Sequence, residues 1–158
     1  MIFLFFACGT QTADRPALQD PSPISESDTT SPTSLVQQLS VREGFSCSRI
    51  KRKDSLLGEF SRIVEEIDKP AWVPMRAVAC MIEIFPAKSR IDLEAWIVDP
   101  NKKGIAFLIA GQVEKLPDQV ALSVVKKGLQ GPHAVDIRIR LEKLDDPRLQ
   151  SILNPKAD

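Results

Sequence analysis

The stretch Glu83-Ile84-Phe85-Pro86 recurs 31 positions later as Glu114-Lys115-Leu116-Pro117, and 28 positions after that as Glu142-Lys143-Leu144-Asp145. Each copy closes an apolar segment of helical length. Self-similarity at an interval of about 30 residues is typical of proteins built from stacked structural repeats. The spacing therefore predicts a repeat architecture for the part of the chain that contains these copies.

A second set of chain breaks keeps the same interval. Asp68-Lys69-Pro70, Asp99-Pro100 and Gly131-Pro132 lie 31 and 32 positions apart, so each interval contains two breaks and two segments of helical length. Proline opens several segments, where its missing amide costs nothing, and Asp118 and Asp146 are candidate N-caps. The predicted helices span residues 70–85, 89–98, 101–116, 118–129, 132–144 and 147–153.

The clearest single helix precedes the first interval, at residues 54–67. Its apolar residues recur at i, i+3 and i+4 and share one face, and Asp54 is a candidate N-cap because its carboxylate can accept the unpaired amides of the first turn. The apolar residues are Leu56, Leu57, Phe60, Ile63, Val64 and Ile67. A shorter helix is predicted at residues 34–42, and Gly44 follows its end.

Two segments also carry a strand pattern. Residues 135–141 and 91–97 alternate apolar with polar or small side chains, and such alternation of β-branched residues is typical of strands. However, Ile91, Ala95 and Val98 also satisfy helical spacing, and the 31-residue interval has no counterpart in strands. The sequence therefore favours helix at both places.

Asp68 followed by Pro70, then Arg76-Ala77-Val78-Ala79 and the ending at residues 83–86, resembles the first helix of a short HEAT repeat. The resemblance covers residues 68–153 and implies a fold made only of helices. HEAT repeats are helix pairs that stack into a right-handed α-solenoid, because a single pair cannot bury its own apolar face. We therefore expect residues 35–158 to form a small α-solenoid of about three HEAT-like helix pairs, with helix 54–67 as its N-terminal cap.

The same resemblance implies a binding surface. In HEAT-like stacks the second helix of each pair lines the concave side, which corresponds here to residues 89–98, 118–129 and 147–153. Side chains of mixed charge on these helices would suit a protein or peptide partner. The exposed candidates are Asp92, Glu94, Gln119, Ser123, Lys126 and Arg148.

The N-terminus carries a second resemblance, centred on Cys8. The apolar run Met1–Ala7 followed by cysteine and then by a polar stretch resembles the end of a bacterial lipoprotein signal peptide. It implies that residues 1–7 are a truncated signal peptide and that Cys8 is the site of lipid attachment. By the same analogy, the absence of Asp after Cys8 favours the periplasmic face or the surface of the outer membrane. An ordinary apolar N-terminus with an unmodified thiol is the alternative.

Residues 8–34 have the composition of a tether. Five Ser, five Thr and four Pro fall among the 26 positions that follow Cys8, with Leu18 and Ile24 as the only large apolar side chains. Such a segment cannot bury enough apolar surface to offset the entropy of ordering it, so we expect disorder. Four acidic residues against Arg15 alone give the tether a net charge of −3, so only the acyl anchor is expected to contact the membrane.

Charge argues against a nucleic-acid partner. The whole chain has 21 basic and 21 acidic residues, so removing the tether's one basic and four acidic residues leaves 20 against 17, a net charge of +3. Nucleic-acid binding usually requires a clustered basic face. The local cluster of Arg49, Lys51, Arg52 and Lys53 has no interleaved aromatic residue for base stacking and is interpreted as a solvated loop.

Residues for catalysis are scarce. His133 is the single histidine, and no second histidine or cysteine pair stands at metal-ligand spacing. There is no Gly-rich phosphate loop and no nucleophile elbow, and Trp72 and Trp96 are interpreted as packing residues. The sequence therefore predicts a protein that is not an enzyme and carries no cofactor or metal.

Cys47 and Cys80 are an even pair if Cys8 is acylated. In an oxidising compartment they are candidates for a disulfide; alternatively, Cys80 is a small core residue inside an apolar run. The sequence leaves both interpretations open. The leading hypothesis is an envelope lipoprotein that serves as a protein-interaction scaffold. The alternatives are a cytosolic HEAT-like scaffold with a mis-assigned N-terminus and a HEAT-like chromophore lyase.

Overall fold

The computed structural model describes residues 32–41, 43–50, 54–66, 70–144 and 146–154. In these residues the chain is all-α, with no strand, as the sequence predicted. The predicted signal peptide and lipidation site at residues 1–8, and most of the tether, lie outside the described residues. The helices are α1 (Pro32–Ser40), α2 (Leu56–Glu66), α3 (Trp72–Ile84), α4 (Arg90–Trp96), α5 (Lys103–Gly111), α6 (Asp118–Gly128), α7 (Ala134–Glu142) and α8 (Pro147–Leu153), with two short 3-10 helices, η1 (Cys47–Arg49) and η2 (Val113–Lys115).

The strand alternative is wrong at both places, and α7 shows why. Ile137 and Leu141 are buried one turn apart, whereas Val135 and Ile139 are exposed one turn apart on another face. Apolar residues at every second position therefore fill two helical stripes rather than one side of a strand. Such a helix has little amphipathic contrast, which is why the sequence pattern was ambiguous.

The observed helix ends lie within two residues of the predicted ones, except in one segment. The segment predicted as one helix over 101–116 divides, because α5 ends at Gly111, a poor helix former, and η2 continues it. Asp118 is the first residue of α6 rather than its N-cap, a position held by Pro117. Asp146 does cap α8, since its carboxylate accepts a hydrogen bond from the Arg148 amide.

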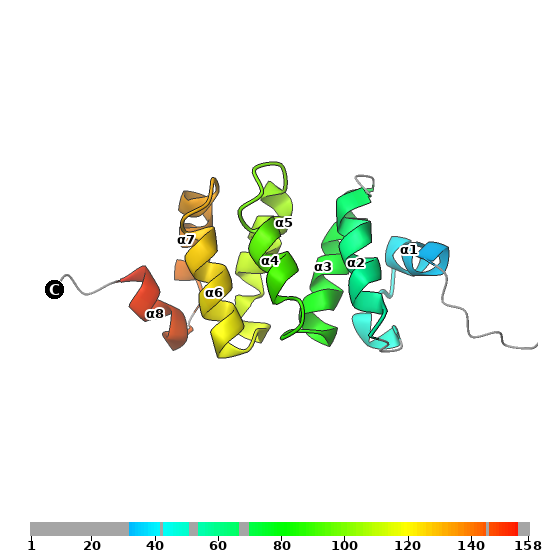
Figure 1. Ribbon diagram of the computed structural model, residues 1–158, viewed down its shortest axis with the longest axis horizontal. Helices are drawn as coiled ribbons and strands as arrows, with labels where there is room; N and C mark the ends of the chain where they lie inside the picture. Colours follow the sequence, from blue (N-terminus) through cyan, green and yellow to red (C-terminus); the bar gives the residue numbers. More distant parts are fainter. Residues whose placement is uncertain (1–31, 42, 51–53, 67–69, 145, 155–158) are drawn as a thin grey trace, which may run out of the picture.

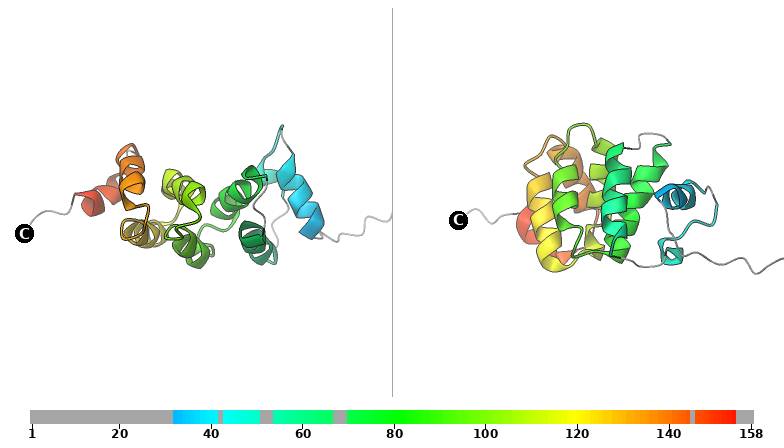
Figure 2. Two further views of the ribbon diagram at one scale, coloured as in Figure 1. Left: turned by 90° about the horizontal axis from the view of Figure 1, so that it is seen from above. Right: turned by 45° about the vertical axis from the view of Figure 1, so that its right-hand side comes forward.

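The helices form two layers along the long axis of the molecule. In Figure 1 the front layer contains α2, α4 and α6, and Figure 2, seen from above, places the back layer of α3, α5 and α7 on the other side. α3 packs against α5 and α5 against α7, while α4 packs against α6. α1 contacts α3 at one end, and α8 contacts α6 and α7 at the other. One continuous apolar core lies between the layers.

α6 packs closely on its neighbours around Gly128. A Cβ added at Gly128 would lie 2.7 Å from the Ile97 Cδ1 atom and 3.2 Å from the Ile137 Cδ1 atom. Because glycine has no side chain, α6 can pack directly on Ile97, which follows α4, and on Ile137 of α7.

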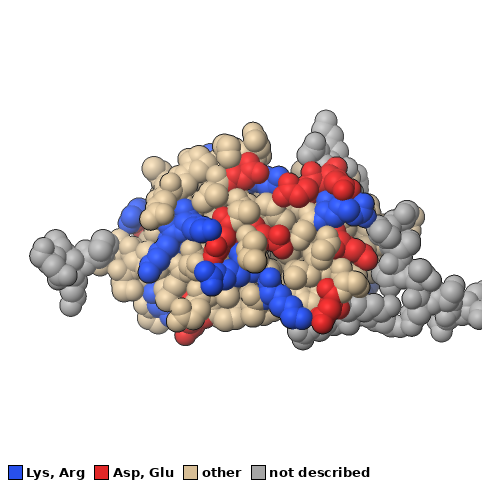
Figure 3. Space-filling model, viewed as in Figure 1, with Lys and Arg blue, Asp and Glu red and all other residues tan. Residues whose placement is uncertain are grey.

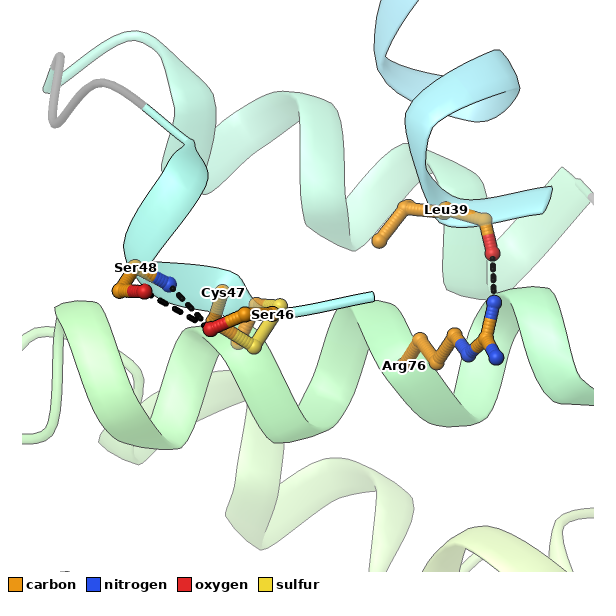
Figure 4. Close-up of a disulfide and its surroundings, with 6 residues drawn as sticks. Leu39, Ser46, Cys47, Ser48 and Arg76 are labelled. Atoms are coloured by element: carbon orange, nitrogen blue, oxygen red, sulfur yellow. Dashed lines mark hydrogen bonds between the residues drawn. A yellow bond between two sulfur atoms is a disulfide. The ribbon is translucent and has the colours of Figure 1, made fainter. Parts of the chain in front are cut away.

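A disulfide fastens the N-terminal segment to α3. Cys47 in η1 and Cys80 in α3 are bonded, with their Cα atoms 5.2 Å apart and both residues buried (Figure 4). On the same side, Arg76 of α3 donates hydrogen bonds to the carbonyl oxygens of Leu39, at 2.8 Å, and Val41 at the end of α1. Its guanidinium lies 4.7 Å from the centre of the Phe45 ring. One covalent and several polar contacts thus hold α1 and η1 on α3.

Candidate functional site

A surface groove crosses the back layer. A pocket of about 380 Å³ is lined by Met75 of α3, Phe107 and Leu108 of α5, and Ile139 of α7. A second pocket of about 240 Å³ adjoins it, since Met75 and Gly104 line both. We name the two pockets together the α5 groove. Nothing lies within 4 Å of a Cβ added at Gly104, so this glycine leaves open space where the two pockets meet.

The rim of the α5 groove is charged. Asp136 is the acidic lining residue of the larger pocket, and it is neutralised by Lys103, whose Nζ atom lies 2.8 Å from its carboxylate. Arg140 and Lys143 also line this pocket, and within the described part of the chain neither forms an ion pair. Arg140 lies directly on α5, because a Cβ added at Gly111 would be 2.9 Å from its Nε atom. The groove therefore combines an apolar floor with two cations that have no ion-pair partner among the described residues.

Polar contacts link successive helices of the front layer, and we call them the front-layer ladder. Ser61 of α2 donates a hydrogen bond to Asp92 of α4 at 2.9 Å, and the Trp96 indole donates one to Glu65 of α2. α4 is joined to α6 through Glu94, and α6 to α8 through Arg148. Figure 3 shows acidic and basic side chains intermixed over this face.

Glu94 is the most enclosed charge in the ladder. Its carboxylate receives the Arg90 Nε–H at 2.6 Å, the Ser123 hydroxyl at 2.6 Å and the Lys127 ammonium at 2.8 Å, and its side chain is only 10% exposed. These donors, Lys127 foremost, lower the pKa of Glu94 to about 2. Glu94 is therefore ionised near neutral pH, and its carboxylate joins α4 to α6.

Lys102, in the loop before α5, forms a second group of charged contacts. Its ammonium lies 2.9 Å from the Glu65 carboxylate and 3.3 Å from that of Asp99. The hydrogen bond from Lys102 lowers the pKa of Glu65, and the same bond raises the pKa of Lys102. His133 joins this group, since its Nε2 atom is 3.1 Å from the Asp99 carbonyl oxygen. His133, at the start of α7, thus links this helix to the α4–α5 loop.

Arg148 fixes α8 to the rest of the domain. Its guanidinium donates to the carboxylates of Asp118, at 2.6 Å, and Asp146, at 2.7 Å, and to the carbonyl oxygens of Leu116 and Glu114. Its bonds to Asp146 lower the pKa of that carboxyl group. Both the loop before α6 and the cap of α8 depend on this one side chain.

The structure separates the six predicted partner-surface residues into two groups. Gln119 and Lys126 are exposed, as expected. Asp92, Ser123 and Arg148 are partly buried and belong to the front-layer ladder, so their polar groups already have partners. The expectation that Glu94 is exposed is wrong, because its three donors enclose it. The predicted surface is thus largely a structural element that holds the helices together.

Other predictions made from single residues have mixed outcomes. The Cys47–Cys80 bond is present, whereas Lys51, Arg52 and Lys53 lie outside the described residues. Trp96 is buried as a packing residue, but Trp72 is 38% exposed. Among the described residues, no group of three or more His, Cys, Asp or Glu side chains is placed to hold a metal ion, and no helix is long and apolar enough to cross a bilayer.

Sequence reasoning missed the α5 groove. Met75 and Ile139 have the spacing of core residues, yet they remain 36% and 49% exposed because the described residues form no further layer over α3, α5 and α7. The available signal was the surplus of apolar residues in 135–141, where two helical faces carry large side chains. A helix with apolar residues on both faces either lies between two layers or leaves one face exposed.

The search for similar proteins gave no assignment. No family model, curated protein or solved structure matches the chain.

Proposed function

We propose that this chain is a lipid-anchored envelope protein whose HEAT-like helical-repeat domain binds a protein partner. Cys8 would carry the acyl anchor, the segment after it would act as a tether, and residues 35–158 would form the binding domain. The proposal assigns no catalytic step and no cofactor. The protein would act by presenting a surface near the membrane, within the range of distances that its flexible tether allows.

The Cys47–Cys80 disulfide is the observation that supports the proposed location in the cell envelope. Disulfides form and persist in oxidising compartments such as the periplasm, and they are rare in the bacterial cytosol. Here both cysteines are buried and the bond closes a sequence separation of 33 residues at the edge of the core. A bond so placed is shielded from solvent reductants and has a structural role, which supports an exported protein.

The spacing of the ladder contacts supports the repeat assignment. Ser61 and Asp92 are 31 residues apart, Glu94 and Ser123 are 29 apart, and Asp118 and Arg148 are 30 apart. These separations match the interval at which the sequence punctuation recurs. Contacts between equivalent helices of neighbouring units are expected in a solenoid, where each repeat touches only its neighbours.

The test is the intact mass of the protein extracted from its native membrane, with Cys8→Ala as the control. We expect loss of Met1–Ala7, addition of acyl chains at Cys8, and a mass lower than that of the reduced chain by two hydrogen atoms, because the Cys47–Cys80 bond replaces two S–H bonds. The Cys8→Ala variant should lack the acyl chains. An unmodified chain with free thiols at Cys47 and Cys80 would overturn the proposal and favour a cytosolic scaffold.

A further inference from the structure

We infer that the α5 groove binds an acidic peptide segment of the protein partner, one that carries large apolar side chains next to carboxylates. The inference deepens the proposed function and rests on it, because it names the surface and the chemistry of the partner. It also moves the binding surface away from the front-layer ladder, whose polar groups are already paired within the domain.

The floor of the α5 groove is apolar and partly exposed. Met75, Phe107 and Ile139 come from three successive helices of the back layer and line one pocket. Apolar side chains left exposed together on a soluble domain mark an interaction site, because their burial by a partner is favourable. The open space above Gly104 gives a side chain of the partner room to enter between α3 and α7.

The charges on the rim of the groove determine which sign of charge the partner should carry. Asp136 is already neutralised by Lys103, while Arg140 and Lys143 have no carboxylate partner among the described residues. The Arg140 side chain is exposed and lies over α5 beside Gly111, so its charge is available to a partner in the groove. A partner carboxylate next to an apolar anchor would pair with these cations, and such complementarity selects acidic over basic segments.

A peptide fits this surface better than a lipid does. The groove lies open across three helices, with its cations at the α7 side and free space at Gly104. A peptide places several apolar side chains and carboxylates at short spacing, which matches this mixture. An acyl chain, in contrast, requires an enclosed apolar cavity for most of its length.

The experiment uses the whole chain with Cys8→Ala, oxidised at Cys47–Cys80, and two fluorescein-labelled probes. One probe is a synthetic peptide of leucine, glutamate and serine, and its twin has every glutamate replaced by lysine. We expect fluorescence polarisation to show about tenfold tighter binding of the glutamate peptide. Equal affinity for the twins, or tighter binding of the lysine peptide, would overturn the inference.

Gly104→Leu tests the location, with Gly58→Leu as the matched control. Both glycines have open space around an added Cβ and both lie in the first turns of a helix, but Gly58 belongs to the front layer. Leucine at 104 would fill the groove, so we expect at least about tenfold weaker binding of the glutamate peptide, and no change for Gly58→Leu. Equal effects of the two substitutions would contradict the inference.

Arg140→Glu tests the charge independently of the Gly104 variant. We expect it to reduce the preference for the glutamate peptide to about threefold or less, because a carboxylate now faces the partner. Lys126→Glu makes the same charge change on α6, away from the groove, and should keep the tenfold preference. If both charge reversals reduce the preference equally, only net charge matters and the groove is not the site.

Other occupants give distinct results that would overturn the inference. A dimer in sedimentation that Gly104→Leu dissociates would assign the groove to a second copy of this chain. Competition by a synthetic peptide of residues 9–31, stronger than that of the glutamate probe, would assign it to the chain's own N-terminal segment. Retention on phosphatidylglycerol vesicles that Gly104→Leu abolishes would assign it to lipid.

Failure of the inference differs from failure of the proposed function. An acylated protein with an identified envelope partner that still binds Gly104→Leu would overturn the groove and leave the proposed function intact. Conversely, the peptide preference and its loss in Gly104→Leu are measured on purified protein, so they stand even if Cys8 is unmodified in the native host.

Discussion

The Lys127 ammonium of α6 lies 2.8 Å from the buried Glu94 carboxylate of α4, and this pair joins two neighbouring helices of the front layer. Arg90 and Ser123 complete the set of donors around Glu94, one from its own helix and one from α6. A carboxylate satisfied in this way stabilises the domain only while it remains ionised.

Stability should therefore depend on the protonation of Glu94. Its folded pKa of about 2 lies below the ordinary value of 4.5, so its contribution is fully present above pH 4.5 and is lost as the pH falls through about 2. We expect Glu94→Gln to lower the free energy of unfolding at pH 7 by about 1–2 kcal/mol, since solvent at the half-exposed Arg90 and Lys127 screens part of the attraction. Urea unfolding of both proteins from pH 7 to pH 2 measures this difference, which should shrink towards pH 2. A difference that stays constant over this range would contradict the assigned role.

The disulfide should stabilise the domain substantially. Cross-linking residues 33 positions apart reduces the entropy of the unfolded chain, which corresponds to about 3–4 kcal/mol in the chain-entropy model. We expect a reducing agent, or Cys47→Ala combined with Cys80→Ala, to lower the urea midpoint accordingly. The double variant serves as the control for the reductant, because it should not respond to it. Identical midpoints for the oxidised and reduced wild type would show that the bond adds no stability.

Arg148 should control the docking of α8. Arg148→Ala removes the guanidinium from Asp146, which is buried, and from three other acceptors, so we expect a loss of about 1–3 kcal/mol. Arg62→Ala is a suitable comparison, since Arg62 forms only an exposed pair with Glu66 and should change stability by less than about 0.5 kcal/mol. Amide hydrogen exchange in α8 should accelerate in Arg148→Ala alone. Unchanged protection of α8 would show that apolar packing is sufficient to hold it.

Two glycines in similar helices should respond in opposite directions to alanine. Gly128→Ala places a Cβ within 2.7 Å of Ile97, so we expect a loss of about 1–3 kcal/mol from overpacking. Gly58→Ala meets nothing within 4 Å and should gain up to about 1 kcal/mol, because alanine favours helix and restricts the unfolded chain. Thermal unfolding of the two variants tests the difference, and a stabilised Gly128→Ala would contradict the close packing of α6.

Local sequence signals predicted the helices well because each one has a local cause. Proline and aspartate mark the start of α8, and the apolar stripe of residues 56–64 determines which face of α2 is buried. The fate of individual side chains was harder to predict. Glu94 looks like a surface residue until Ser123 and Lys127, 29 and 33 positions later, are brought to it by the packing of α6 on α4. The orientation of α6 relative to α4 depends on the packing of the whole core, so no local sequence pattern predicts it.

The α5 groove was missed for a related reason. Met75 and Ile139 have the spacing of buried residues, and the sequence alone does not reveal how many layers the helices form. Only the absence of a layer over α3, α5 and α7 in the described structure turns these residues into exposed ones. The number of layers, rather than the secondary structure, thus decided where the candidate site lies.

The covalent link at Cys47 also determines how the domain would bear a mechanical pull. When tension is applied between the two ends of the chain, the disulfide transfers it from η1 directly to Cys80 in α3. Residues 48–79, which include α2 and the first half of α3, then lie on a closed loop that carries no tension. In an oxidised protein stretched from its N-terminus, α1 would yield first, and α2 would stay folded until α3 is detached from its neighbours.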